Sequence, residues 1–166
     1  MIEQLSKIRS EDLIVKEASP KEGIAKLFDR MDQLNKTKGN TIQAFDYDGV
    51  INKTHLLAAY INALMAFGSH SNKAKSASME MLLFAAMTDQ IGTAIETVGA
   101  KENSKILMFA NSEKGFDGMR DLLKEIKEFR PSAQHTAQAL KKFGIKNTED
   151  ADRLVLQKMA MSRLKS

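Results

Sequence analysis

Residues 76–101 read SASMEMLLFAAMTDQIGTAIETVGAK, and this stretch decides more of the fold than any other part of the chain. It predicts a short apolar helix, a polar break at Thr88-Asp89-Gln90, a second apolar helix and a glycine stop at Gly99. The stretch contains no nucleophile–base pair, no cluster of metal-ligating residues and no glycine-rich loop that could cradle a phosphate. It therefore predicts part of a protein core and a surface that a partner holds.

The composition limits the class of protein. The chain has 166 residues, 43% of them hydrophobic and 28% charged, which is typical of one globular domain over residues 1–166. It has no cysteine, which excludes disulfides, thiolate catalysis and cysteine metal sites. No apolar run reaches the roughly 18 residues of a membrane span, and the start, MIEQLSKIRSED, is too polar for a signal peptide, so a cytoplasmic protein is expected. The net charge of +4 permits a nucleic-acid partner without requiring one.

Two capping signals predict where helices begin. The sequence SPKE at residues 19–22 combines a capping serine, a proline at the first helical position and a glutamate that completes a capping box. Asn52 predicts the start of another helix, which Gly68 ends.

The rest of the chain predicts a mixed fold. Strands are predicted within residues 2–18, 41–45 and 105–109. Helices are predicted over 116–126 and 132–143, followed by a last helix that Thr148 caps. The fold class is therefore α/β (α+β): a small, mixed, largely antiparallel sheet of three to four strands covered by helices.

The segment FDYDGVI at residues 45–51 is the sharpest chemical motif. It resembles the first motif of haloacid-dehalogenase-type phosphatases, in which Asp46 would attack phosphorus, Asp48 would be the general acid/base and Mg²⁺ would offset their charges. The later acidic pair, Glu149-Asp150, follows no predicted strand, whereas the phosphatase motif requires one. A strand end followed by a turn explains the same residues, and the phosphatase remains the alternative function.

The three histidines do not predict a metal site. His55, His70 and His135 lack a spacing that suits shared coordination, and exposed positions are expected for all three. No metal and no cofactor are predicted.

From residue 43 to its end, the chain resembles the kinase-binding accessory subunit of the KEOPS complex, the PRPK-binding protein family. FD at 45–46 followed by NKTHLL at 52–57 is similar to that family's FDAD…GKEHLL. Residues 76–101 are similar to its NSLxMEILLYASGxRQIxxAIExxGxK, and FGI at 143–145 with LVLQKMAM at 154–161 is similar to its FGI…LVLERVAL. The resemblance covers about three quarters of the chain.

The resemblance implies a subunit without catalytic residues. KEOPS installs threonylcarbamoyl on the adenosine next to the anticodon of tRNA, and the accessory subunit binds the kinase-like ATPase and contacts the 3′ CCA end of tRNA. Two positions depart from the family pattern: Met87 replaces a glycine and Asp89 replaces a basic residue. An aspartate at that position would repel a phosphate.

The sequence then yields two sets of candidate site residues. The last helix has too many apolar positions for one core stripe, which favours a kinase-binding face, although packing of all of them in the core is an alternative. The candidate kinase-binding residues are Leu156, Met159, Ala160, Arg163 and Leu164. The candidate tRNA-binding residues are Lys73, Lys75, Ser78, Gln90, Ala94, Val98 and Lys101.

Overall fold

The computed structural model describes residues 8–146 and 149–164. The chain forms two compact units, one from residues 8–47 and 100–129 and the other from 48–99 and 130–164. The first is called the sheet unit here and the second the helical unit. A single domain over residues 1–166 stays a prediction.

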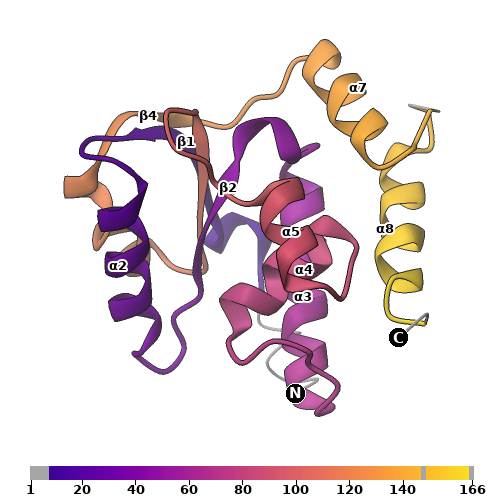
Figure 1. Ribbon diagram of the computed structural model, residues 1–166, viewed down its shortest axis with the longest axis horizontal. Helices are drawn as coiled ribbons and strands as arrows, with labels where there is room; N and C mark the ends of the chain where they lie inside the picture. The colour runs from indigo at the N-terminus through magenta and orange to yellow at the C-terminus, as the bar shows by residue number, and fades with distance from the viewer. Residues whose placement is uncertain (1–7, 147–148, 165–166) are drawn as a thin grey trace. The chain divides into compact units, whose positions relative to one another are not determined.

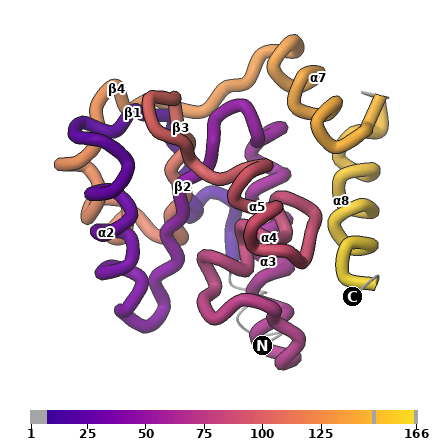
Figure 2. Tube along the Cα trace, viewed as in Figure 1, coloured from indigo at the N-terminus to yellow at the C-terminus, as the bar shows by residue number. Residues whose placement is uncertain are grey.

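The sheet unit contains an antiparallel sheet of four strands in the order β2-β3-β1-β4. Its elements are η1 (Ser10–Asp12), β1 (Ile14–Pro20), α2 (Ile24–Asn35), β2 (Ile42–Asp46), β3 (Ile106–Ala110), α6 (Glu113–Asp117), η3 (Arg120–Leu122) and β4 (Leu123–Glu128). The strand order can be followed along the tube in Figure 2, where β3 is labelled. The predicted fold class is confirmed, and within the described residues every strand pair is antiparallel.

One face of this sheet packs against α2 and α6, and α2 lies beside the strands in Figure 1. Alternate residues of each strand point to that face because the side-chain period of a strand is two. The buried side chains of this core are Ala18, Leu27, Met31, Ile42, Ala44, Ile106, Met108, Ala110, Phe116, Met119 and Leu123.

The helix start predicted at residues 19–22 is wrong. Ser19 and Pro20 are the last residues of β1, and they pair with Lys124 and Leu123 of β4. Helix α2 begins at Ile24, whose N–H donates to the carboxylate of Glu102, with 3.2 Å to Oε1. A carboxylate distant in sequence therefore supplies the cap, which local sequence patterns cannot reveal.

The helix predicted over residues 116–126 is also wrong beyond its first two residues. Helix α6 ends at Asp117, and β4 pairs with β1 from Leu123 onward. The register shifts between Glu17 and Ser19, and Glu125 opposite this shift has a φ of 56°, so an extra residue forms a bulge. The bulge brings Leu123 and Ile126 to the same core face although they are three residues apart, a spacing that imitates a helix.

The helical unit contains five α-helices among its described residues: α3 (Lys53–Gly68), α4 (Ala77–Ala86), α5 (Ile91–Val98), α7 (Ala133–Lys142) and α8 (Ala151–Met161). A 3-10 turn, η2 (Tyr47–Gly49), precedes α3 in the chain. Figure 1 shows α3, α4 and α5 gathered together. The predicted Asn52 cap is confirmed, since its Oδ1 accepts the N–H of His55 at 2.9 Å. The predicted cap Thr148 lies outside the described residues. In the part of the chain that the structure describes, no helix is long and apolar enough to cross a membrane.

Candidate functional site

Helix α8 is attached to α3 at both its start and its middle. Asn52, the cap of α3, donates its Nδ2 to Asp152 Oδ1 at 3.0 Å. Further along the two helices, Asn62 Nδ2 lies 3.4 Å from the sulfur of Met159. Val155 and Met159 are buried, and Met159 has no exposed surface. Met159, a candidate kinase-binding residue, is therefore part of the chain's own core.

The end of α8 is attached to α4 by a buried ion pair. Arg163 Nη2 lies 2.6 Å from Oε1 of Glu80, and the guanidinium stacks 4.0 Å from the ring centre of Phe84. Glu80 is fully buried, and its carboxylate also accepts the backbone N–H groups of Lys73 and Ala74. Arg163, another candidate kinase-binding residue, therefore makes internal contacts.

Of the other candidates, Leu156 and Ala160 lie on one exposed side of α8, and Leu164 lies in the turn that follows the helix. Leu156 is 45% exposed and Leu164 is 82% exposed, and Ala160 between them is exposed as well. Residues four apart lie on the same side of a helix. Met161, which is 54% exposed, extends the apolar area.

Helix α3 adds a second apolar row beside the first. Leu57 and Ile61 are half-buried and Met65 is exposed, again at a spacing of four. A shallow groove of about 240 Å³ is lined by Thr54, Leu57, Ala58, Ile61, Asn62 and Leu156. We call the set Leu57, Ile61, Met65, Leu156, Ala160 and Leu164 the α3/α8 apolar surface. The sequence did not single out these α3 residues, because apolar residues at helical spacing are expected in the core.

The polar candidates for RNA contact lie around α4. Lys73 and Lys75 are exposed in the loop before α4. Ser78 is half-buried, with its Oγ 3.2 Å from Ser76 Oγ. Gln90 is exposed at the cap of α5, and its Nε2 donates to Oδ1 of Asp89 at 3.1 Å. These groups can meet a polar or anionic ligand without rearrangement of the core.

The two apolar candidates on α5 are placed differently. Ala94 and Val98 are fully buried, so their side chains do not offer a surface. The exposed face of α5 carries Ile91 and Ile95, which are 45% and 48% exposed. Residues 91, 94, 95 and 98 have the spacing of one apolar stripe, so the sequence pattern does not separate the exposed pair from the buried pair.

Lys101 belongs to the sheet unit, where its Nζ lies 3.6 Å from Oδ2 of Asp46. Asp46 ends β2 and is 7% exposed, while Asp48 is exposed in η2. Residue 49 is a glycine, and a Cβ atom at this position would lie only 2.9 Å from the carbonyl oxygen of Thr97. The segment at residues 45–51 is therefore the end of a strand followed by a turn whose backbone lies close to α5. An RNA contact by Lys101 stays a prediction.

The expectation of three exposed histidines is correct only for His70, since His135 is half-buried and the third, His55, is buried. Its ring is buried in α3, where Nδ1 accepts the N–H of Ile51 at 3.1 Å and Nε2 lies 2.8 Å from the carbonyl oxygen of Ala85. The first bond fixes the neutral tautomer with the proton on Nε2. Burial lowers the pKa of His55 to about 4. Across the described ranges, no group of three or more His, Asp or Glu could hold a metal ion.

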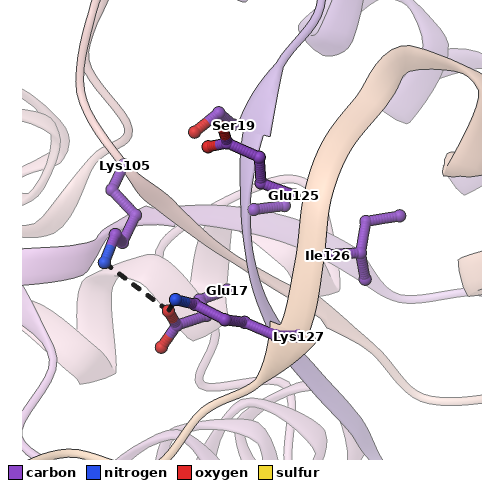
Figure 3. A pocket seen from close by; sticks show the side chains of 7 residues that line it. Glu17, Ser19, Lys105, Glu125, Ile126 and Lys127 are labelled. Carbon is purple, nitrogen blue, oxygen red and sulfur yellow. Dashed lines mark hydrogen bonds and ion pairs between the residues drawn. The ribbon is translucent and has the colours of Figure 1, made fainter.

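The sheet unit has a pocket of about 450 Å³ beside the bulge of β4 (Figure 3). Lys105 and Lys127 both direct their ammonium groups at the buried Glu17, with Nζ–Oε1 distances of 3.5 and 3.3 Å. Glu125 and Ser19 line the same pocket. Two lysines and two glutamates together leave the lining without a net charge.

Met87, one of the two residues that depart from the family pattern, has an unusual backbone conformation. It ends α4 with φ 58° and ψ 44°, the left-handed conformation that glycine adopts most easily. The resemblance places a glycine at this position, so the turn between α4 and α5 keeps a glycine-like backbone although the side chain has changed.

Comparison with known proteins identifies the protein class to which this chain belongs. Residues 21–163 match the family model described as kinase binding protein CGI-121, which defines a class of accessory proteins that bind a kinase. The chain belongs to the CGI-121 family. This is the family of the KEOPS kinase-binding subunit, so the resemblance found in the sequence is confirmed. No match was found among curated proteins.

Proposed function

We propose that this chain is the non-catalytic subunit of a KEOPS-type tRNA-modification complex and binds its kinase-like ATPase through the α3/α8 apolar surface. Family membership supports the accessory kinase-binding role. The observation that supports this location is the group of exposed and half-buried apolar side chains on α3 and at α8, with Leu156 lining the groove beside α3. Exposed apolar patches of this kind are typical of protein–protein contact.

We expect Leu156→Glu to weaken binding of the kinase-like ATPase by about 100-fold or more, because a carboxylate would be buried in an apolar contact. Titration calorimetry with the ATPase subunit from the same organism measures this effect. Gln157→Glu is the matched control, since it adds the same charge one residue further along α8 at another exposed position. Equal affinity of both variants would contradict this surface, and the absence of any complex with the unchanged chain would contradict the function.

The proposal includes contact with the 3′ CCA end of tRNA near α4 and α5. Exposed Lys73 and Lys75 can meet phosphates, Gln90 can donate to polar groups, and the exposed Ile91 and Ile95 can contact unpaired bases. Asp89 is half-buried beside Gln90 and makes this turn less favourable for a phosphate.

We expect the double variant Lys73→Gln/Lys75→Gln to weaken tRNA binding about tenfold and to reduce the slope of log K against log salt by about 2. Fluorescence anisotropy with labelled tRNA over a range of salt concentrations measures both. Lys141→Gln/Lys142→Gln, which removes two exposed lysines of α7, is the matched control. Equal affinity for tRNA with and without its CCA end would refute the 3′-end contact.

A further inference from the structure

The last part of the loop before α4, residues 73 and 74, is held by a side chain of the helix that follows. Residues 69–75 contain the two exposed lysines and, at His70, a positive φ of 58°. The N–H groups of Lys73 and Ala74 donate to Oε2 of Glu80 at 3.0 and 2.7 Å. Glu80 lies one turn inside α4 and has no exposed surface. The position of Lys73 and its neighbours therefore depends on where this carboxylate points.

Arg163 holds the same carboxylate from the other side. Its Nη2 lies 2.6 Å from Oε1 of Glu80, which also accepts the N–H of Lys73 at 3.3 Å, so the loop and the arginine share this oxygen. The Arg163 side chain is 16% exposed, and its guanidinium also stacks on Phe84. A carboxylate in such surroundings is stable only while its cation stays in place. Movement of Arg163 must therefore be transmitted to Glu80 and to the loop.

Arg163 lies in the turn after α8 and precedes Leu164 of the α3/α8 apolar surface in the chain. Ala160 accepts the N–H of Arg163, and Leu164 is the next residue in the chain. A partner that covers Ala160 and Leu164 orders the turn that carries Arg163. Ordering of one site changes the affinity of another when both act on one shared element.

We infer that Glu80 and Arg163 are positioning residues that connect the two surfaces: kinase bound at the end of α8 fixes the loop with Lys73 and Lys75 for RNA, and RNA on the loop favours kinase binding. The coupling rests on the proposed function. The positioning of the loop by Glu80 and Arg163 does not, because it follows from contacts within the chain.

The first arm of the test uses the chain alone. Backbone order parameters from NMR relaxation are expected near 0.85 for residues 73 and 74 in the unchanged chain and below about 0.6 in Arg163→Met. Strand β3 is the internal reference and stays rigid in both. Arg153→Met removes an exposed arginine of the same helix, paired with Asp150 at 3.3 Å, and leaves the loop rigid. Arg163→Gln, which removes the charge but keeps a hydrogen-bond donor, serves if Arg163→Met does not fold. A rigid loop in the Arg163 variant would overturn the inference.

The second arm measures the affinity for a short RNA ending in CCA with and without saturating kinase-like ATPase. We expect the ATPase to raise the affinity about fivefold or more in the unchanged chain and in Arg153→Met, and to have no such effect in Arg163→Met. Contacts between the ATPase and RNA would persist in all three proteins, so the comparison isolates the path through Arg163. An equal gain in all three would overturn the coupling. If the unchanged chain binds neither partner, the proposed function fails and the coupling with it, while the first arm still decides whether Arg163 positions the loop.

Discussion

Replacing Arg163 by methionine is expected to lower the free energy of unfolding by about 3 kcal/mol, because the carboxylate of Glu80 is then buried without its cation. Glu80 has no exposed surface, so water cannot take the place of the guanidinium. The two backbone N–H groups that Glu80 accepts offset only part of this cost. Urea unfolding followed by circular dichroism measures the loss.

The double variant Glu80→Gln/Arg163→Met separates charge from packing. A glutamine keeps an oxygen for the N–H groups of Lys73 and Ala74 but carries no charge, so the double variant should recover a large part of the lost stability. Arg153→Met should stay within about 0.5 kcal/mol of the unchanged chain, since its ion pair with Asp150 is exposed. If the double variant is as unstable as Arg163→Met, the loss comes from packing on Phe84 and the charge argument is wrong.

The helix starts that the sequence predicts correctly are those capped by a side chain that immediately precedes the helix. Asn52, Ser76 and Ser132 each accept a backbone N–H three residues on and begin α3, α4 and α7. A cap of this kind needs only neighbouring residues, so a pattern of a few letters reveals it. Gly99 likewise follows the last residue of α5.

The two wrong predictions in the sheet unit share one cause. Residues 19–22 have a good local helix start, yet Ser19 and Pro20 pair with a strand more than 100 residues away. The same pairing turns residues 123–128 into β4, and the bulge at Glu125 gives Leu123 and Ile126 a helix-like spacing. Partners distant in the sequence outweighed local preference in both places.

The sequence predicted which helix presents the candidate site but not which of its side chains are exposed. The last helix does present an apolar row, yet Met159 and Arg163 face inward while Leu156, Ala160 and Leu164 face outward. A glutamate in a helix is usually exposed, so nothing in the sequence marks Glu80 as a buried partner for an arginine more than 80 residues later. Tertiary packing alone decides which residues of an apolar helix remain available.

Acidification is expected to destabilise the protein through His55. The pKa of His55 is lowered from 6.5 to about 4 by burial, so between these values the unfolded chain binds a proton that the folded chain does not. Stability contributed by the neutral ring is therefore complete above pH 6.5 and is lost as pH falls toward 4. A difference of this size corresponds to about 3 kcal/mol.

Unfolding in urea at pH 7.5 and pH 4.5, compared between the unchanged chain and His55→Gln, isolates this contribution from that of the carboxylates. Protonation of the ring would place a second N–H against the N–H of Ile51, which now donates to Nδ1, and would bury a charge beside Phe143. Glutamine cannot titrate, so the variant should lose about 2 to 3 kcal/mol less between the two pH values. An NMR titration of the His55 ring gives an independent check, because its signals should stay constant down to about pH 5. Equal losses in both proteins, together with a ring that titrates near 6.5, would show that His55 is accessible to water and that the helical unit opens around it.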